Sequence, residues 1–388
     1  MTTALRSLCL SAVFAAMLAG CSGGSKPLDE NAKPVSTATT ASGAPMDAEK
    51  VVNVYNWSDY IEPSVLTDFK KEYGIKVNYD VFDSNEVLET KLLAGGSGYD
   101  VVVPSANFLA RQIQAGVFQK LDKSKLPNLS NMWDVVSERT AKYDPGNEYS
   151  INYMWGTVGL GYNVKKVKEA LGVEELDSWD FLYNPEKLSK LADCGIHVLD
   201  SPSDMIPTTL KYLGLDPEST APEDLAKVEE ALLKIRPYVR KFHSSEYINA
   251  LANGDICFAV GWSGDVFQAR DRAEEANQGV EVNYTIPKEG AEMWFDQMAI
   301  PADAQHVEEA HEFLNYIMKP EVAAKATNYV YFPSGNKAAQ AFVNKEILED
   351  PAVYPDDEML AKLFTVSPYD TKAQRNVTRL WTKVVTGQ

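Results

Sequence analysis

The stretch of sequence that decides the fold begins VVNVYNWSDYIEPSVLTDFKKEYGIKVNYDVF at residue 51 and ends YDVVVPS at residue 105. Runs rich in β-branched and aromatic residues alternate here with segments whose apolar residues recur at helical spacing and which stop at glycines. The pattern predicts a strand, a helix, a strand, a helix and a strand over residues 51–57, 63–73, 75–82, 84–98 and 99–105. This order is typical of an α/β fold with a parallel sheet and helices on its faces.

Polar and aromatic side chains crowd the turns that follow two of these strands. Trp57, Ser58, Asp59 and Tyr60 stand between the first strand and the first helix, and Ser105 follows the third strand. In parallel sheets of this kind, ligands bind beyond the carboxyl ends of the strands, in the loops that lead into helices. Both turns are therefore candidate binding loops.

The remainder of the chain predicts a second lobe and at least two crossings between the lobes. Residues 149–163 and 281–301 are long extended stretches, residues 223–242 are helical in pattern, and residues 255–265 form a further strand and turn. Two crossings would create a hinge and a cleft that the loops of both lobes face. We expect lobe boundaries at 51–157 plus 285–335 and at 158–284 plus 336–388.

The first 20 residues have the pattern of a signal peptide. Arg6 precedes an apolar run over residues 8–18 that is too short to span a bilayer. The run ends in LAGC at residues 18–21, which resembles the lipobox of bacterial lipoproteins, and this makes Cys21 the expected lipidation site. Residues 21–50 contain almost nothing large and apolar, so we expect a disordered tether after the lipidated cysteine. The alternative is an ordinary cleaved signal peptide with an incidental cysteine.

The composition limits the partners of the folded part. The chain of 388 residues has a formal net charge of −18, and removal of residues 1–20, which contain Arg6 and no acid, would make it one unit more negative. Such a surface repels nucleic acid and anionic lipid headgroups and mildly favours a cationic partner. No later segment is apolar for long enough to span a membrane, so we expect membrane contact through the lipid anchor alone.

Two cysteines remain after the signal peptide and Cys21 are set aside. Cys194 and Cys257 form a pair in an exported chain, where oxidation is expected, and we interpret them as a disulfide. A bond closing a loop of about 60 residues stabilises the fold by about 4 kcal/mol in the chain-entropy model. Two buried thiols, or a metal or catalytic site, are the alternatives, and the second lacks neighbouring histidines.

Four short segments carry carboxylates, and three of them pair an indole with a carboxylate two or three residues further on. They are residues 57–60, 199–205, 262–265 and 294–296, and each stands at a strand end or a predicted crossing. If they face one cleft, they form an aromatic box rimmed by acids, which suits an aliphatic ligand with separated ammonium groups. Taken singly, each indole could instead pack in a core or hinge, and each acid could be a helix cap or an N-terminal helix charge.

From about residue 51 to the end, the chain resembles the polyamine-binding proteins of ABC importers, especially the putrescine-binding branch. The resemblance rests on the runs YNWSDYI, GYDVVVPSANFLARQ, FHSSEYINALANGDICFAVGWSGDVFQA, IPKEGAEMWFDQMAIPADA, FLNYIMKPEVAA and LFTVSPYD, which stand in the order and spacing of that family. It implies a type II periplasmic-binding-protein fold, in which two α/β lobes close over a polyamine, and it implies no catalysis. The expected function is extracytoplasmic binding of a polyamine and its delivery to an ABC permease.

The resemblance also implies a set of ligand contacts. Carried over by motif position, they are Trp57, Ser58, Asp59, Tyr60, Ser105, Asp204, Trp262, Asp265, Trp294 and Asp296. Trp57 and Trp262 would sandwich the aliphatic chain. Asp296 with Ser58 would hold one ammonium group, and Asp204 with Asp265 the other. The disulfide of the family matches Cys194 and Cys257.

Three positions depart from the putrescine-binding branch. The resemblance would place Glu at Asp204, Phe at Trp294 and Tyr at Phe332. A shorter acid, a larger indole and a lost phenol change the volume and the polar contacts of the pocket, and Trp at position 294 is more like the spermidine-binding branch. We therefore expect putrescine as the first candidate ligand and spermidine as the second.

Other classes of function fit the sequence less well. His306 and His311 are five residues apart on a probable helix and so do not share a face as a metal pair would, and neither a GxSxG elbow nor a P-loop occurs. We expect no enzyme activity, no cofactor, no metal and a monomer. The alternative function is a polyamine-sensing accessory protein that signals to a membrane receptor.

Overall fold

The computed structural model describes residues 50–387. The predicted signal peptide, the predicted lipidation site at Cys21 and the predicted tether lie outside the described residues. Over residues 50–387, none of the helices combines the length and the apolar character needed to cross a bilayer. Asp47–Gln388 is one compact unit by its contacts, and the fold below refers to this unit.

The strands form one continuous sheet in the described part of the chain. Their bounds are β1 Val51–Trp57, β2 Lys76–Phe82, β3 Val101–Val102, β4 Ser150–Asn163, β5 Ile196–Val198, β6 Lys241–Phe242, β7 Phe258–Trp262, β8 Val282–Thr285 and β9 Met293–Ala299. The order across the sheet is β2-β1-β3-β9-β4-β7-β5-β6, and β8 also pairs with β4. Strands β1, β2 and β3 are parallel to one another, as are β5, β6 and β7, which confirms the expected parallel pairing.

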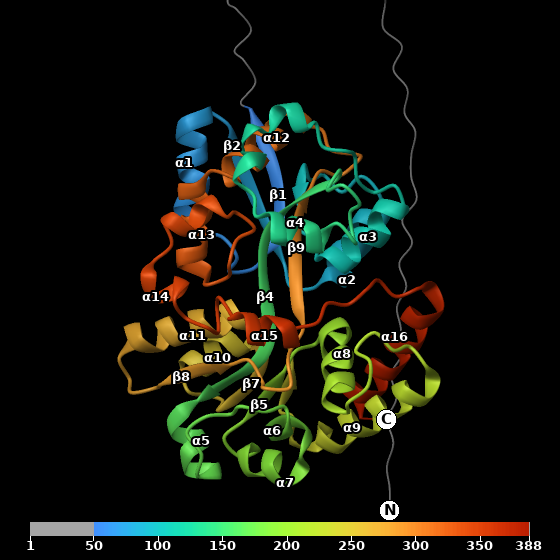
Figure 1. The fold of residues 1–388 in the computed structure, drawn as a ribbon, viewed down its shortest axis with the longest axis vertical. Coiled ribbons are helices and arrows are strands. Elements are labelled where there is room, and N and C mark those ends of the chain that lie inside the picture. Colours follow the sequence, from blue (N-terminus) through green and yellow to red (C-terminus); the bar gives the residue numbers. More distant parts are fainter. Residues whose placement is uncertain (1–49, 388) are drawn as a thin grey trace, which may run out of the picture. The chain divides into compact units, whose positions relative to one another are not determined.

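The long strand β4 connects the two parallel halves of the sheet. Its first part, Ser150–Thr157, pairs antiparallel with β9, and its second part, from Val158 onward, pairs antiparallel with β7 and β8. Figure 1 shows β4 and β9 side by side where they pass between the two groups of elements. The expected crossing over residues 149–163 is therefore a single strand whose partners change between Thr157 and Val158.

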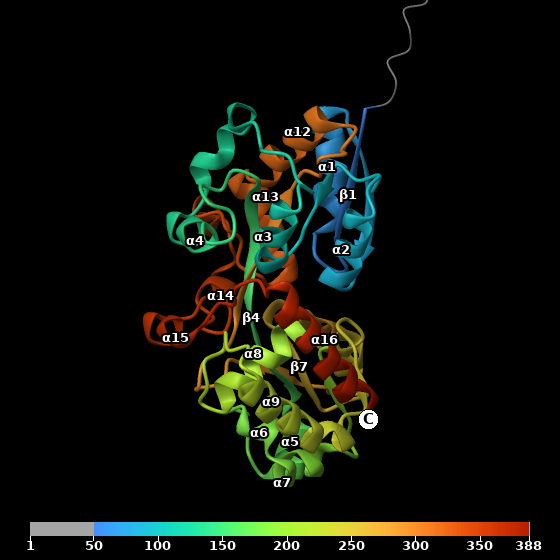
Figure 2. The same ribbon diagram turned by 90° about the vertical axis from the view of Figure 1, so that its right-hand side faces the viewer.

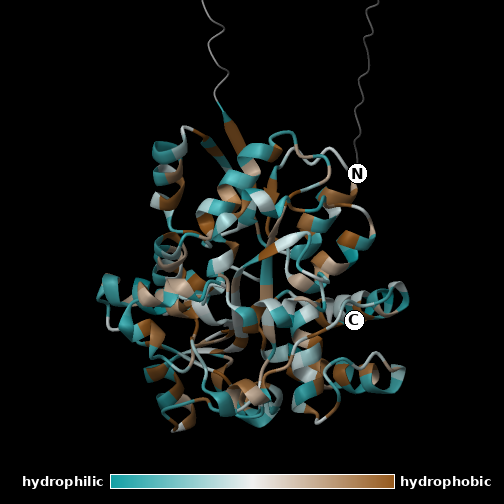
Figure 3. Cartoon of the chain, turned by 45° about the horizontal axis from the view of Figure 1, so that its top comes forward, coloured by the Kyte–Doolittle hydropathy of each residue, from teal (hydrophilic) through white to brown (hydrophobic). Residues whose placement is uncertain are grey.

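Helices cover both halves of the sheet. Their bounds are α1 Pro63–Tyr73, α2 Asn85–Leu93, α3 Ala106–Gln114, α4 Asp134–Thr140, α5 Val164–Leu171, α6 Asp180–Tyr183, α7 Pro185–Leu188, α8 Pro202–Tyr212, α9 Pro222–Ile235, α10 Tyr247–Ala252, α11 Ser263–Ala276, α12 Val307–Ile317, α13 Pro320–Val330, α14 Lys345–Leu348, α15 Asp357–Lys362 and α16 Thr371–Thr386. Figure 2 shows the C-terminal helix α16 packed against α8 and α9. Many helices carry separate hydrophilic and hydrophobic stripes, as Figure 3 shows, because one face of each lies on the sheet.

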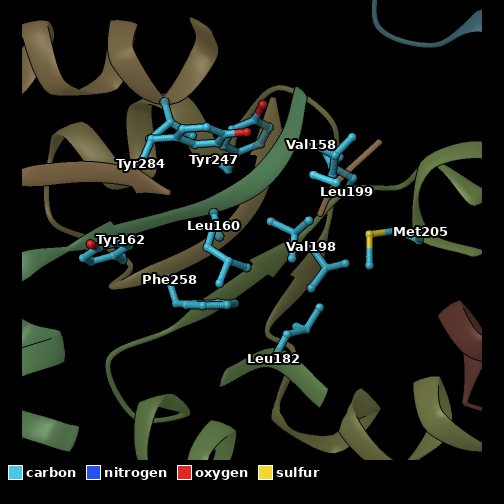
Figure 4. Packing of buried hydrophobic residues seen from close by; sticks show 14 of the residues in the cluster. Val158, Leu160, Tyr162, Leu182, Val198, Leu199, Met205, Tyr247, Phe258 and Tyr284 are labelled. Carbon is cyan, nitrogen blue, oxygen red and sulfur yellow. The ribbon is translucent and has the colours of Figure 1, made fainter. Parts of the chain in front are cut away.

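Two large hydrophobic cores lie on the two halves of the sheet. One contains Val52 and Val54 of β1 with Val65 and Phe69 of α1, and further members come from residues 298–332. The other contains apolar residues between positions 158 and 384. Figure 4 shows Val158 and Leu160 of β4 beside side chains of β5 and β7 in this second core. Trp262 and Trp294 pack against both cores, so they lie where the two halves meet.

The structure corrects one helix prediction and refines others. Residues 223–242 do not form one helix: α9 ends at Ile235, Pro237 follows in a short 3-10 turn, and Lys241 and Phe242 pair with β5 as strand β6. The predicted extended stretch over residues 281–301 is two strands, β8 and β9, separated by a turn. Cys194 and Cys257 are joined by a disulfide with a Cα–Cα distance of 5.5 Å, which confirms that prediction.

Candidate functional site

A cavity of about 770 Å³, part of it open to solvent, lies where the loops of the two sheet halves meet. Loops that follow the carboxyl ends of parallel strands supply most of its lining, as the sequence predicts for an α/β sheet. Its lining residues are Trp57, Ser58, Tyr60, Asp83, Ser84, Asn85, Glu86, Ser105, Asn107, Asp200, Ser201, Ser203, Asp204, Ser244, Ser245, Ile248, Trp262, Asp265, Glu292, Trp294, Asp296 and Phe332.

The lining has an unbalanced charge. It includes seven carboxylate side chains, those of Asp83, Glu86, Asp200, Asp204, Asp265, Glu292 and Asp296. Within the described part of the chain, no lysine, arginine or histidine joins them in the lining. Like charges in a partly desolvated space raise one another's pKa values and attract a cation strongly. The cavity is therefore built to receive positive charge.

Asp296 is a buried carboxylate of the cavity that accepts two hydrogen bonds from hydroxyl groups. It is 4% exposed and lies on β9. Ser105 Oγ donates to its Oδ1 at 2.7 Å, and the Tyr60 hydroxyl donates to its Oδ2 at 2.9 Å. Burial raises the pKa of Asp296 from 3.8 to about 7, although both hydrogen bonds favour the ionised form.

Asp265 lies in the first turn of α11, immediately after β7. It is 7% exposed, and the Tyr247 hydroxyl donates to its Oδ2 at 2.7 Å. The partial positive charge of a helix N-terminus stabilises a carboxylate there. Burial nevertheless raises the pKa of Asp265 from 3.8 to about 7, because a single neutral donor does not replace the lost water.

Asp204 occupies the equivalent place in the first turn of α8, after β5. It is 8% exposed, and it accepts hydrogen bonds from the Ser201 hydroxyl and, at 3.3 Å, from Trp262 Nε1. Burial raises the pKa of Asp204 from 3.8 to about 6. Asp204 thus holds the Trp262 indole in place and is itself part of the cavity lining.

Glu292 is a cavity residue that the sequence interpretation missed. It is 3% exposed, and its Oε2 is buried without a hydrogen-bond partner among the described residues. Burial raises its pKa well above the ordinary value. The signal that could have found it is the alternation of the extended stretch, since Glu292, Trp294 and Asp296 are spaced two apart and so point to one side of the strand.

Aromatic rings form the walls of the cavity. The Trp57 and Trp262 rings lie 5.9 Å apart in an edge-to-face arrangement, and Trp57 Nε1 donates to the Val103 carbonyl at 2.8 Å. The Trp294 and Phe332 rings are also edge-to-face, with centroids 5.1 Å apart. Trp57 and Trp262 thus contact each other edge to face, and the sandwich of an aliphatic chain between them stays a prediction.

Two glycines permit these rings to approach the backbone. A Cβ on Gly156 of β4 would lie 2.6 Å from the Trp294 ring and 2.9 Å from the Phe332 ring, and a Cβ on Gly264 of α11 would lie 2.6 Å from Phe332. Such contacts are closer than real Cβ atoms adopt. Trp294 and Phe332 therefore depend on glycine at these two places.

The structure brings together all but one of the predicted ligand contacts. Asp59 does not line the cavity: it has a φ of 53°, and its carboxylate accepts a hydrogen bond from Arg272 Nη2 of α11 at 2.8 Å. Ser58 lines the cavity, and its hydroxyl donates to Asp83, while the Ser105 hydroxyl donates to Asp296. Asp59 therefore joins a loop of one half to a helix of the other.

Two histidines, His306 and His311, form contacts outside the cavity. His306 Nδ1 contacts Asp100 at 2.9 Å, and His311 Nε2 accepts a hydrogen bond from the Asp122 backbone at 2.9 Å. Among residues 50–387, no group of three or more His, Cys, Asp or Glu side chains is placed to hold a metal ion.

Comparisons with known proteins all point to bacterial solute-binding proteins. Residues 64–355 match the family described as bacterial extracellular solute-binding proteins. The chain is 56% identical over 340 residues to a putrescine-binding periplasmic protein of Pseudomonas aeruginosa (strain UCBPP-PA14), covering 87% of this chain and 93% of that protein. It is 53% identical over 342 residues to a putrescine-binding periplasmic protein of Escherichia coli (strain K12), covering 88% of this chain and 92% of that protein.

A solved structure also has a similar fold. It is described as a putative spermidine/putrescine ABC transporter from Listeria monocytogenes, is 32% identical, and covers 87% of this chain and 100% of that one with a TM-score of 0.79. This likeness confirms the α/β periplasmic-binding-protein fold that the sequence predicts.

Proposed function

Because the chain belongs to the bacterial extracellular solute-binding proteins, we propose that it binds a polyamine in the cavity, outside the cytoplasm, and delivers it to the permease of an ABC importer. Putrescine is the first candidate ligand and spermidine the second. The relatives named above carry these ligands in their descriptions. The role is that of a binding protein and not of an enzyme.

One observation carries the proposal: the cavity buries several carboxylates with only neutral hydrogen-bond donors beside them. Asp204, Asp265 and Asp296 are each less than 10% exposed, and no cationic side chain of residues 50–387 lines the space between them. Burying a charge without a counter-charge costs several kcal/mol in stability. A ligand with ammonium groups supplies the missing charge, while its methylene groups pack on the indoles of Trp57, Trp262 and Trp294.

The same charges provide a mechanism for closure. We propose that the two cores belong to two lobes with the boundaries predicted from the sequence, and that the lobes close over the ligand. Without a ligand, Asp265 and Asp204 on one side repel Asp296 on the other and resist closure. A bound dication reverses this repulsion, so the ligand favours the closed state by its difference in affinity for the two states. The closed state is then the form that a permease recognises.

The position in the cell is part of the proposal. The pattern of residues 1–21 supports a periplasmic protein that a lipid on Cys21 anchors to the membrane, with the folded part acting as a monomer. Incorporation of radioactive palmitate into the chain, and its absence from a Cys21→Ser variant, would test the anchor separately from binding.

A thermal-shift panel tests the binding function directly. The purified protein is heated with putrescine, cadaverine, spermidine, agmatine or a neutral diol of the same chain length as putrescine. A ligand at about a thousand times its dissociation constant stabilises the folded state by about 4 kcal/mol. We expect the melting temperature to rise with the polyamines and to be unchanged with the diol. An equal shift with the diol, or no shift with any amine, would refute the proposal.

A further inference from the structure

Glu292 differs from the other buried acids of the cavity in its hydrogen bonds. Asp204, Asp265 and Asp296 each accept at least one hydrogen bond from a neighbouring side chain, whereas Glu292 Oε2 accepts none from the described residues. Glu292 is also the most buried of the four, at 3% exposed. A buried, unpartnered carboxylate is costly, and where it faces a binding cavity its partner is expected to come from the ligand.

Among residues 50–387, no cationic side chain forms an ion pair with Glu292. The positive charge of Lys142 acts on Glu292, but its ammonium group donates to Thr365 Oγ1 at 2.6 Å and forms no ion pair with Glu292. The indole nitrogen of Trp294, two residues further along, is itself buried without a partner and does not donate to Glu292. The carboxylate therefore remains available to the cavity.

The strand geometry fixes how far Glu292 lies from the other binding groups. Side chains alternate along β9, so that Met293 and Phe295 pack in a core on one side while Glu292, Trp294 and Asp296 face the cavity on the other. At about 3.4 Å per residue, the Cα atoms of Glu292 and Asp296 are about 14 Å apart, with an indole between them. The Trp294 indole thus separates Glu292 from Asp296 along this acid-indole-acid row.

Glu292 adds a fourth buried carboxylate to the cavity. Asp204, Asp265 and Asp296 are the three acids assigned to two ammonium groups, and Glu292 lines the same space. Burial and, to a lesser extent, the negative charge of Asp204 raise the pKa of Glu292. The cavity therefore has one buried carboxylate more than the diamine assignment uses.

Building on the proposed function, we infer that Glu292 binds a third cationic nitrogen, so that the cavity recognises a linear triamine as well as a diamine. A diamine would be held by Asp296 with Asp265 and Asp204. The additional aminoalkyl arm of a triamine would pass along the Trp294 ring, and its terminal ammonium group would donate to Glu292. Glu292 is then a specificity-determining residue that favours the longer ligand.

Calorimetric titration of matched variants tests this inference. Spermidine and putrescine are each titrated into the wild-type protein and into Glu292→Gln, which keeps the shape and removes the charge. A hydrogen bond to a charged group corresponds to about tenfold or more in affinity. We expect Glu292→Gln to lose about tenfold or more in affinity for spermidine and less than about threefold for putrescine. The exposed Glu281→Gln variant makes the same change in net charge and should alter neither affinity.

Other outcomes distinguish the inference from its alternatives. Equal losses for the two amines, or no loss for spermidine, would overturn the inference. If the wild-type protein bound neither amine, the proposed function itself would be contradicted. A structural role for Glu292 would appear as a lower melting temperature of ligand-free Glu292→Gln, whereas the inference predicts an equal or higher one. Glu292→Leu, which replaces the buried charge by an apolar side chain, should show the same selective loss for spermidine.

Discussion

At the scale of single residues, the cavity is defined by buried acids with no lysine, arginine or histidine beside them in the lining that residues 50–387 form. Asp296 has two hydroxyl donors, Asp265 has one, and Glu292 Oε2 has none among the described residues. Neutral donors only partly replace the hydration of a carboxylate, so these side chains are held at a cost to stability. Residues that break the usual rules of burial in this way mark a site whose partner comes from outside the chain.

Removal of the Asp296 charge should weaken binding without harming the fold. Asp296→Asn keeps the size of the side chain, and loss of one partner of a buried charged pair costs about 3 kcal/mol, or more than a hundredfold in affinity. Calorimetric titration with putrescine measures the loss, and the exposed Asp255→Asn variant is the control. An affinity for putrescine equal to that of the wild type would remove Asp296 from the site.

The raised pKa values predict that binding depends on pH. The pKa values of Asp296 and Asp265 are raised by burial to about 7, and that of Asp204 to about 6. A cationic ligand binds the ionised carboxylates, so its affinity should increase from pH 5 to pH 8, and binding at pH 6 should release protons. Titration at pH 6 in two buffers with different ionisation enthalpies measures that release. An affinity independent of pH would contradict the assignment.

The raised pKa of Asp296 also makes the stability of the ligand-free protein depend on pH. An acid whose pKa is higher in the folded state contributes stability that is complete below its unfolded value of about 4 and is lost as the pH rises through the folded value. For Asp296 that loss is complete above pH 7 or so. Asp296→Asn should therefore be more stable than the wild type at pH 8, and the difference in melting temperature should vanish near pH 4. A difference in melting temperature that stays the same from pH 4 to pH 8 would contradict the raised pKa of Asp296.

Single residues also mark where sequence reasoning succeeded and failed. Asp204, Asp265 and Asp296 were predicted from motifs, and all three line the cavity. Asp59 was predicted from the same motif as Trp57, but the left-handed backbone at Asp59 turns its side chain towards Arg272. Glu292 was missed because its spacing of two residues from Trp294 and four from Asp296 indicates only a shared side of the strand, and not that this side faces the cavity.

At the scale of elements, the turn between β1 and α1 contacts helix α11 across the two halves of the sheet. The Asp59 carboxylate pairs with Arg272 at 2.8 Å, and Gln268 Nε2 donates to the Asp59 carbonyl at 3.3 Å. Both charged side chains are about one-third exposed or more, so the pair contributes at most about 1 kcal/mol. We interpret it as a contact that supports the arrangement of the two halves.

This interpretation predicts a small effect of Asp59→Asn. Because the pair contributes at most about 1 kcal/mol, the affinity for putrescine should change by no more than about fivefold. The measurement is the same titration as for Asp296→Asn, which serves as the comparison. A hundredfold loss would show that Asp59 contacts the ligand after all.

Strand β4 makes the approach of Trp294 and Phe332 possible through Gly156. In Gly156→Ala the new methyl group would meet both rings at less than 3 Å, so one ring must move. Overpacking of this kind costs about 1–3 kcal/mol in stability. Urea unfolding should detect that loss, and the displaced ring should also weaken putrescine binding. Unchanged stability together with unchanged affinity would contradict the packing described here.

The elements themselves were predicted well where their pattern is local. Strand β1 and helix α1 have the bounds expected from the sequence, because the strand composition, Pro63 and Gly74 each act within a few residues. The two-residue strand β6 was missed, because Lys241 and Phe242 are extended only through pairing with His197 and Val198, more than forty positions earlier. Pairing over such separations leaves no periodic signal.

At the scale of the whole molecule, the sequence predicted the fold class and a long extended crossing, but not the change of partners along it. The long stretch over residues 149–163 was expected to cross between lobes, and β4 does pair with β9 in one half and with β7 and β8 in the other. The arrangement of the rings, by contrast, depends on the relative placement of both halves, so the edge-to-face contact of Trp57 with Trp262 was not predicted.

The disulfide should stabilise the whole fold without affecting the cavity. Cys194 and Cys257 precede β5 and β7, at the ends of these parallel strands opposite to the binding loops. Closing a loop with a sequence separation of 63 contributes about 4 kcal/mol. The double variant Cys194→Ala/Cys257→Ala should therefore melt several degrees lower, as measured by calorimetry. Its affinity for putrescine well below the melting temperature should equal that of the wild type, and a large loss would mean that the bond shapes the site.

The central claim is that the buried carboxylates of one cavity bind the cationic nitrogens of a polyamine. A crystal structure of the protein with putrescine tests this claim most directly. We predict that the diamine lies in the cavity with its nitrogens within hydrogen-bond distance of Asp296 at one end and of Asp265 or Asp204 at the other, and with its methylene groups against the indoles. A diamine found outside the cavity, or within it but away from these carboxylates, would contradict the account.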